Sequence, residues 1–312
     1  MRYYRKVQKI GSSMLVSLPK EWVIENELSK GSVLLVDVGN DIIIRSKRES
    51  KSKEAVINYP SRYGDMPLKE ITGAYLLGYD IILVKGENSI SYNDRELIKD
   101  AIKRLVGLEI IDEDAHNIKA QFLLDATTLD PRKILQRINS IINGMYKDTI
   151  SSFNNKNDSI MKIIRVRDEE INRQYFLLVR FLRSALLDNT LAERINLTSI
   201  DILDYRIAAN LFEGVGDSIV ELARLVANTK DVEMDVIDTA LMIGKLQSLA
   251  VNAFLNNNRA YSIQVINEYN TLNNIFEKMK SHKDASTLNI IYMLDRIAKA
   301  WTDVADLVKT ID

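Results

Sequence analysis

LFEGVGDSIVELARLV (residues 211–226) and MLDRIAKAWTDVADLV (residues 293–308) resemble each other at a fixed offset of 82 residues. In both segments apolar residues recur three and four positions apart, which is the spacing of one face of an α-helix. The acidic positions keep the same phase, because Glu213 aligns with Asp295 and Glu221 aligns with Asp303. Since apolar and acidic positions are both retained, we expect a duplicated helical unit.

Helical spacing continues through the whole C-terminal part of the chain. All four prolines lie within the first 131 residues and only four of the twelve glycines lie beyond them, so little interrupts a helix after Pro131. Asp130 followed by Pro131 is a typical helix start. Helical spacing predicts six helices, over 131–153, 158–188, 198–227, 231–256, 259–280 and 284–311. We therefore predict a multidomain, mainly α chain that ends in a six-helix bundle of two three-helix repeats, over residues 129–312.

The middle of the chain, residues 51–128, predicts a linker followed by a small α/β unit. Residues 47–54 are charged and poor in apolar side chains, and we expect them to be exposed. Helices are expected near 68–77 and, after the capping residue Asn93, over 94–106; strands are expected over 80–84, 108–112 and 118–124. No motif with catalytic spacing occurs here, so we expect a structural connector or a dimerisation element.

The first 50 residues predict a small, basic, strand-rich domain. Two strand-forming regions, 6–18 and 32–45, are interrupted by glycine-led turns and flank a short helix over 19–26. Residues 1–53 carry eleven Lys/Arg against six Asp/Glu, whereas the whole chain has a net charge of −1. A concentrated positive charge attracts a polyanion. Because so few residues in short strands cannot bury an adequate core, two copies are expected to interleave.

Composition disfavours several classes of protein. The chain has no cysteine and only two histidines, which excludes disulfides and thiolate metal sites and disfavours zinc enzymes and Ser-His triads. No stretch approaches 18 uncharged apolar residues, and the first ten residues lack the apolar core of a signal peptide. We therefore expect a soluble, cytoplasmic, non-enzymatic protein that has no membrane insertion and needs no cofactor.

Residues 5–47 resemble the AbrB/SpoVT/MazE family of swapped-hairpin DNA-binding domains. The shared features are the basic Arg5-Lys6, the turn Gly11-Ser12-Ser13, the helix start Pro19-Lys20-Glu21 and the hairpin over 39–44, and the turn is nearest the MazE type. The resemblance implies a homodimer that binds a palindromic operator in double-stranded DNA. The expected DNA-binding residues are Arg5, Lys6, Lys9, Ser12, Ser13, Arg45 and Lys47. The alternative is that these cations only protect a solvated strand edge.

A polar stripe runs along the helix predicted over 198–227; its members, three or four residues apart, are Arg206, Asn210, Glu213, Asp217, Glu221 and Arg224. The helical region resembles the PhoU family, a duplicated three-helix bundle associated with phosphate homeostasis, whose acidic motifs hold iron or zinc. Residues 210–217 look like one such motif and residues 295–299 look like its repeat. Lys299 replaces an expected aspartate, and Asn172 beside Asp168 replaces another carboxylate. Metal binding is therefore not expected, and the weak candidate ligands are Glu213, Asp217 and Asp295.

Two interpretations of Lys299 stay open. In the first, its ammonium group pairs with Glu213 or Asp217 across the bundle and replaces the metal by a salt bridge. In the second, the groove has become an anion site for inorganic phosphate, an effector rather than a cofactor. The residues expected in that site are Lys299, Arg206, Asn210, Arg165 and Arg173.

The two resemblances together indicate a domain order similar to that of an archaeal-type phosphate uptake regulator. They imply a transcriptional regulator of phosphate homeostasis and uptake genes, with DNA binding and dimerisation in residues 1–50 and phosphate sensing in the PhoU-like domain. Two alternatives are an antitoxin of a toxin–antitoxin system, suggested by the MazE-type turn, and a PhoU-like adaptor that contacts phosphate transporter components.

Overall fold

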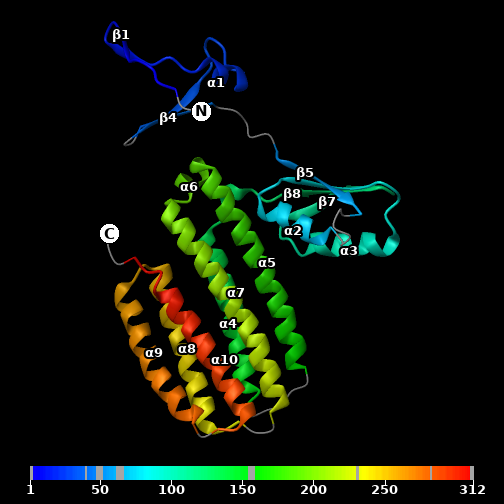
Figure 1. The fold of residues 1–312 in the computed structure, drawn as a ribbon, viewed down its shortest axis with the longest axis vertical. Coiled ribbons are helices and arrows are strands. Elements are labelled where there is room, and N and C mark those ends of the chain that lie inside the picture. Colours follow the sequence, from blue (N-terminus) through cyan, green and yellow to red (C-terminus); the bar gives the residue numbers. More distant parts are fainter. Residues whose placement is uncertain are drawn as a thin grey trace. The chain divides into compact units, whose positions relative to one another are not determined.

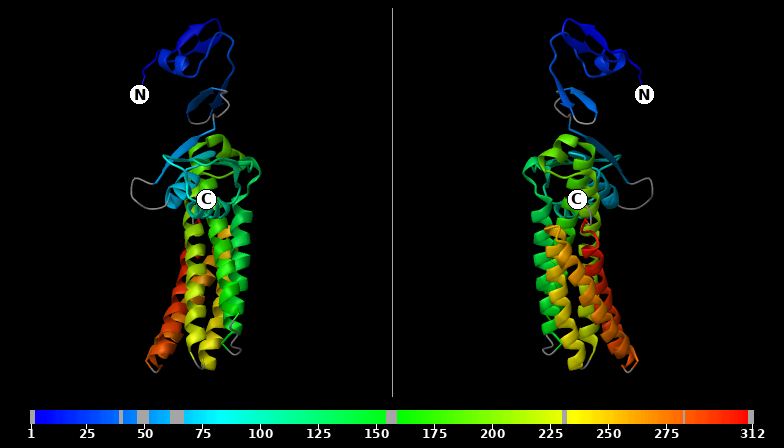
Figure 2. Two further views of the ribbon diagram at one scale, coloured as in Figure 1. Left: turned by 90° about the vertical axis from the view of Figure 1, so that its right-hand side faces the viewer. Right: turned by 90° about the vertical axis from the view of Figure 1, so that its left-hand side faces the viewer.

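The computed structural model describes residues 3–38, 41–46, 52–60, 67–153, 159–229, 232–281 and 283–309. The chain divides into two compact units, Met1–Ser52 and Lys53–Asp312. Figures 1 and 2 show the helices and strands of each unit, coloured along the chain. We describe each unit by itself.

The first unit consists of two hairpins and one short helix. Strand β1 (Gln8–Ile10) pairs antiparallel with β2 (Ser13–Leu15), and β3 (Leu34–Val38) pairs antiparallel with β4 (Ile42–Ser46). Helix α1 (Lys20–Glu25) follows Pro19, as the sequence predicts. Gly11 has a φ of 63°, in the left-handed region that glycine adopts without strain, and this conformation closes the tight β1–β2 turn.

The second unit begins with a four-stranded sheet of order β5-β6-β8-β7. Its strands are β5 (Glu54–Tyr59), β6 (Ile81–Gly86), β7 (Leu108–Glu113) and β8 (Asn117–Phe122). Only the β5–β6 pair is parallel. Helices α2 (Leu68–Leu76) and α3 (Tyr92–Lys103) pack on one face, where Ile82, Val84 and Ile118 are fully or almost fully buried. The α/β unit expected from the sequence is present.

Two details of this layer differ from the sequence-based expectation. Strand β5 was not predicted, because it begins with the last of the charged residues 47–54 and, as an edge strand, has one buried residue, Ile57. Residues 47–51 lie outside the described part of the chain. Helix α3 is capped by Ser91 rather than Asn93, since the Ser91 hydroxyl accepts a hydrogen bond from the backbone N–H of Asp94 at 3.2 Å.

The remainder of the second unit is a bundle of long helices. They are α4 (Pro131–Ser151), α5 (Ile160–Leu187), α7 (Ser199–Asn228), α8 (Met234–Leu255), α9 (Arg259–Lys280) and α10 (Ala285–Ala305). The short helix α6 (Asn189–Arg194) follows α5, and one 3₁₀ turn (Ala126–Thr128) precedes α4. The predicted mainly α, multidomain architecture with six long helices is confirmed. The ends of the first five lie within three residues of the expected ones, whereas α10 ends at Ala305 rather than at 311.

The helices group as two triples. Helices α4, α5 and α7 contact one another, α8, α9 and α10 do the same, and contacts of α7 with α10 and of α4 with α8 join the triples. At the seam the Phe212 and Trp301 rings meet edge to face, with centroids 5.2 Å apart. The aligned residues Ala223 and Ala305 are both buried. These two residues, which align in the sequence repeat, are therefore equivalent in burial as well.

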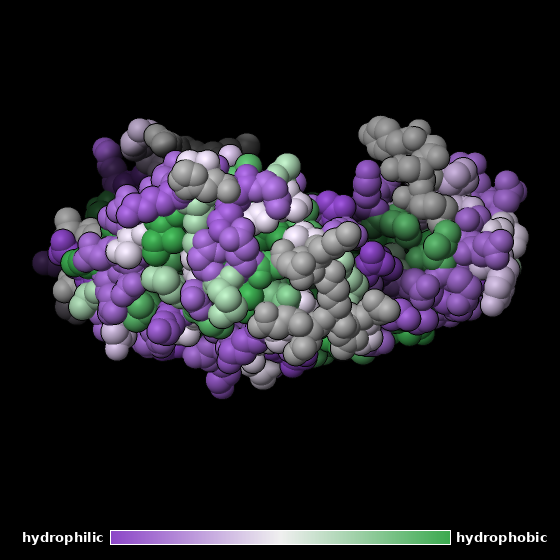
Figure 3. All heavy atoms as spheres, turned by 90° about the horizontal axis from the view of Figure 1, so that it is seen from below, coloured by the Kyte–Doolittle hydropathy of each residue, from purple (hydrophilic) through white to green (hydrophobic). Residues whose placement is uncertain are grey.

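Polar side chains cover most of the lower end of the bundle, and apolar residues show between them in the view from below (Figure 3). Helices α8 and α10 begin at this end (Figure 1). No helix in the described part of the chain has the length and apolar character needed to cross a membrane.

Candidate functional site

The β1–β2 hairpin presents most of the predicted DNA-binding side chains. Arg5 and Lys6 precede β1, Lys9 lies in β1, and the two serines lie at the turn and the start of β2; all five are exposed. Arg45 lies apart from them on β4, is half-buried and is in register with Leu35 of β3. Lys47 lies outside the described residues.

The first unit has no hydrophobic core of its own. None of its described residues is buried, and apolar side chains such as Val7, Met14, Val33 and Val38 are 64 to 76% exposed. Apolar surface on this scale is unusual for a monomer and marks an interaction surface. These exposed apolar side chains are therefore available to a partner.

Three carboxylates lie together between α5 and α7. Burial, then Asp217, then Asp168 raise the pKa of Glu213, and Arg206 opposes them. Burial and Asp217 likewise raise the pKa of Asp168. The helices approach closely at Gly216, where a Cβ atom would lie 3.1 Å from Ile171 Cδ1. In the described part of the chain no three acidic or histidine side chains have the geometry to hold a metal ion.

The predicted arginines lie on the α5 side of the bundle and do not converge. The Arg206 guanidinium carbon lies 5.4 Å from the ring centroid of Tyr175, whose hydroxyl is 3.5 Å from Asn210 Oδ1. Arg173 lies 3.9 Å from the carboxylate of Glu170, and Arg165 is exposed. Only Asn210 connects this group to the site predicted around Lys299.

Lys299 lines a different groove, of about 390 Å³, between α7 and α10. Asn210, Asp295, Arg296 and Asp303 line it as well. Asp295 accepts hydrogen bonds from Tyr269 at 3.1 Å and from Lys280 at 3.3 Å. Burial raises the pKa of Asp303, and the positive charge of Lys299 partly offsets this rise. The groove therefore contains charges of both signs.

The salt-bridge interpretation of Lys299 does not hold. Among the described residues Lys299 forms no ion pair with Glu213 or Asp217, because these carboxylates lie beside Asp168 of α5 whereas Lys299 lies on α10. Residues 210, 214 and 218 of α7 line the groove between α7 and α10. Residues 213 and 217 directly precede two of these positions, so their side chains project from a different face of the helix. The stripe seen in the sequence is thus divided between two surfaces.

Two segments of the chain match known family models. Residues 7–52 match "Antidote-toxin recognition MazE, bacterial antitoxin", and residues 135–226 match "PhoU domain". The chain joins a MazE-like segment to a PhoU-like domain. Both resemblances inferred from the sequence are thereby confirmed. The PhoU match covers α4, α5 and α7, which is the first of the two helical triples.

Two solved structures are similar to the bundle. The phosphate transport system regulatory protein PhoU from Streptococcus pneumoniae is 15% identical, with 58% of this chain and 96% of that chain covered and a TM-score of 0.45. PhoU from Pseudomonas aeruginosa is 15% identical, with coverage of 57% and 93% and a TM-score of 0.48. Among curated proteins no match was found.

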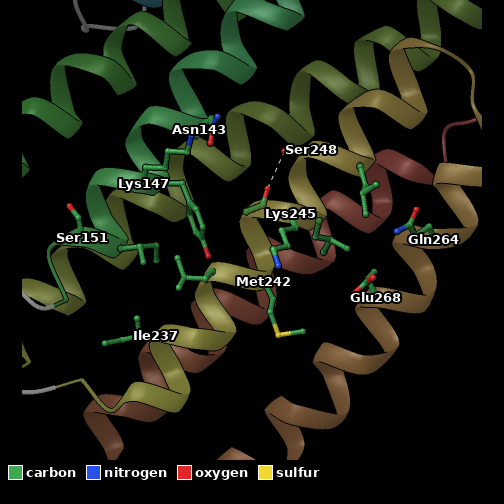
Figure 4. Close-up of a pocket in the computed structure, with 15 residues that line it drawn as sticks. Asn143, Lys147, Ser151, Ile237, Met242, Lys245, Ser248, Gln264 and Glu268 are labelled. Atoms are coloured by element: carbon green, nitrogen blue, oxygen red, sulfur yellow. Dashed lines mark hydrogen bonds between the residues drawn. The ribbon is translucent and has the colours of Figure 1, made fainter.

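The PhoU-like domain has a second groove, of about 830 Å³, between α4, α8 and α9 (Figure 4). Its lining combines apolar residues, among them Leu241 and Met242, with the exposed Lys147 and Lys245. Buried Tyr146 donates a hydrogen bond to the carbonyl of Ala240 at 2.7 Å and so ties the two triples together. The sequence did not indicate this groove, because its residues come from three separated helices.

Sequence reasoning also missed Arg180, a charged residue within the apolar run FLLVRFL of α5. It is only 4% exposed, and its hydrogen-bond partners Tyr75, Tyr79 and Asp80 belong to the α/β layer. A buried arginine within an apolar helix face needs partners to offset its desolvation. An arginine within an apolar run is a signal that the sequence contains, but the sequence does not indicate which residues are its partners.

Proposed function

We propose that this chain is a DNA-binding transcriptional regulator that acts as a homodimer and responds to phosphate through its PhoU-like domain. The observation that carries the proposal is the β1–β2 hairpin, whose exposed Arg5, Lys6 and Lys9 lie in a MazE-like segment without a core of its own. A second copy would cover the exposed apolar side chains and duplicate the basic hairpin.

Such a dimer suits a palindromic duplex. Two-stranded ribbons fit the major groove, and a two-fold axis between the copies repeats the contacts on two half-sites. Arg5, Lys6 and Lys9 supply phosphate or guanine contacts, and the hydroxyls of Ser12 and Ser13 supply short hydrogen bonds at the turn. Arg45 on β4 and Lys47 add phosphate contacts at the edge.

Salt-dependent binding of the full chain to promoter fragments tests the DNA-binding part. We expect the logarithm of the affinity to fall linearly with that of the salt concentration, and Lys9→Gln to reduce the slope by about one. Lys103→Gln, an exposed cation of α3 in the second unit, is the matched control. Equal slopes for Lys9→Gln and wild type would count against the hairpin as the DNA contact.

Inorganic phosphate is the proposed effector, and the α7–α10 groove with Lys299 and Asn210 is its proposed site. An ammonium group and an amide suit phosphate oxygens, and Arg296 adds a second cation to the groove. Calorimetry with phosphate compares wild type, Lys299→Met and the control Lys245→Met, which alters the other groove. Identical isotherms for wild type and Lys299→Met would remove Lys299 from the site.

An antitoxin is the second candidate function, because the model that matches residues 7–52 is described as a bacterial antitoxin. A small toxin that copurifies with the chain in stoichiometric amount would favour it. Copurification of phosphate transporter subunits would instead favour an adaptor of a transporter.

A further inference from the structure

Arg180 is a buried contact between helix α5 of the bundle and the α/β layer. Its Nη1 donates hydrogen bonds to the carbonyls of Tyr75 at 2.7 Å and Tyr79 at 2.8 Å. Both carbonyls belong to the C-terminal end of α2 and the turn after it, where the Tyr75 carbonyl also accepts the Gly78 N–H at 3.1 Å. The guanidinium lies 3.9 Å from the Phe122 ring centroid and 5.1 Å from that of Tyr75. The α/β layer therefore supplies two carbonyls, one carboxylate and two aromatic rings to this cation.

The remaining partner of Arg180 is Asp80, which directly precedes β6. Arg180 Nη2 lies 3.3 Å from Asp80 Oδ1, and the other carboxylate oxygen, Oδ2, accepts the backbone N–H of Lys53 at 2.9 Å. The Asp80 N–H donates to the Lys53 carbonyl at 2.8 Å, and the Asp80 carbonyl accepts the Phe122 N–H at 2.8 Å. One aspartate thus connects a bundle helix to Lys53.

Lys53 is the first residue of the second compact unit and directly precedes β5. Strand β5 lies at the edge of the sheet and pairs only with β6. The start of β5 is therefore held by β6 and by the Asp80 carboxylate. Any displacement of α5 changes the position of the guanidinium that orients this carboxylate.

We propose that Arg180, Asp80 and Lys53 form a bridge that transmits the position of bundle helix α5 to the point where the chain leaves the DNA-binding segment. The proposal rests on the DNA-binding function proposed above. The bridge is short, and hydrogen bonds to charged groups are stronger than neutral ones. Helix α5 also carries Asp168, which faces Glu213 and Asp217 of α7, so a change between α5 and α7 reaches the bridge through one continuous helix.

A double-mutant cycle in the full chain tests the bridge. Gly216→Ala is the perturbation, because its Cβ would lie 3.1 Å from Ile171 Cδ1, closer than ordinary van der Waals contact, so that the contact between α5 and α7 must adjust. Arg180→Met cuts the bridge. Arg183→Met is the control, since Arg183 donates to the Leu76 carbonyl at 3.3 Å but does not contact Asp80. The readout is amide hydrogen exchange of Lys53 and the start of β5.

We expect Gly216→Ala to change the Lys53 exchange rate about threefold or more in the wild-type and Arg183→Met backgrounds, and to leave it unchanged in Arg180→Met. An equal change in the Arg180→Met background, or none in the wild type, would overturn the bridge. Asp80→Asn keeps the shape of the side chain but removes its charge. In this background too, Gly216→Ala should leave the Lys53 exchange rate unchanged, and Asp80→Asn provides the test if Arg180→Met does not fold. The same variants are then compared for DNA affinity. A chain that binds no DNA would refute the proposed function, but the hydrogen exchange of Lys53 would still show whether the bridge exists.

Discussion

Glu213 and Glu221 lie about two turns apart on α7 and have opposite electrostatic environments. Glu213 is half-buried beside two other carboxylates, which raises its pKa above the usual 4.5. Glu221 accepts two hydrogen bonds from the Arg224 guanidinium, at 2.5 and 2.9 Å, and these lower its pKa. A raised pKa means that folding favours the protonated form, so this group's contribution to stability is lost as pH rises through the folded pKa.

Glu213→Gln should therefore stabilise the bundle at neutral pH relative to wild type, and the difference should shrink as pH falls toward 4.5. Urea unfolding of both proteins between pH 4.5 and 8 measures the difference. Glu221→Gln is the matched control and should be slightly destabilising above pH 4.5, because it removes a favourable pair. A Glu213→Gln variant that is less stable than wild type at pH 8 would contradict the assignment.

At the residue scale the sequence indicated candidate functional side chains better than it indicated which of them lie together in the structure. The expected DNA-binding residues from Arg5 to Ser13 lie at one hairpin, because residues joined by a tight turn cannot separate. Lys299 and Arg206 do not meet, because Arg206 of α7 lies over Tyr175 of α5 whereas Lys299 of α10 lines the groove between α7 and α10. Partner choice across separate helices depends on packing angles that local spacing does not encode.

At the element scale, helix α7 begins with a reciprocal cap. The Thr198 hydroxyl accepts the Asp201 N–H at 3.2 Å, and the Asp201 carboxylate accepts the Thr198 N–H at 2.8 Å. Lys309, near the end of the described chain, pairs with the same carboxylate at 2.5 Å. This cap fixes the start of the longest helix of the bundle.

Thr198→Ala should cost about 1 kcal/mol of unfolding free energy, because Asp201 loses the acceptor of its backbone N–H. Denaturant unfolding at constant pH measures the loss. Thr271→Ala is the control: its hydroxyl donates to the carbonyl of Asn267 within α9, and its removal should be nearly neutral. Equal losses in the two variants would show that the cap does not stabilise α7.

The seam between the two helical triples depends on Trp301, which is 1% exposed and meets Phe212 of α7. Trp301→Ala should cost about 3 to 5 kcal/mol, because it leaves a cavity where α7 and α10 pack. Trp301→Phe retains much of the volume and should cost less. Thermal unfolding followed by circular dichroism compares the two. A small loss in Trp301→Ala would mean that the triples are joined elsewhere.

The sequence predicted the helices of the bundle well and the strands less well. Long amphipathic helices repeat one period many times, so their pattern is clear. Strand β5 has six residues and lies at a sheet edge, and its position next to a charged run concealed it. The pairing of β5 with β6 is fixed by contacts distant in sequence, which no local pattern contains.

At the scale of the whole molecule, the two units differ in how they are stabilised. The second unit buries two hydrophobic clusters, one in the bundle and one in the α/β layer, whereas no described residue of the first unit is buried. The second unit should therefore fold alone, and the first should fold fully only when a second copy covers its apolar side chains. The apparent stability of the first unit should consequently depend on protein concentration.

The chain's two tryptophans separate these transitions, because Trp22 lies in α1 of the first unit and Trp301 lies in the bundle. In Trp301→Phe, fluorescence reports only the first unit, and its thermal midpoint should rise with protein concentration. In Trp22→Phe, fluorescence reports only the bundle, and its midpoint should stay constant. A concentration-independent midpoint for Trp22 would mean that the first unit is stable as a single copy; the homodimer, and with it a palindromic operator, would then have to be abandoned.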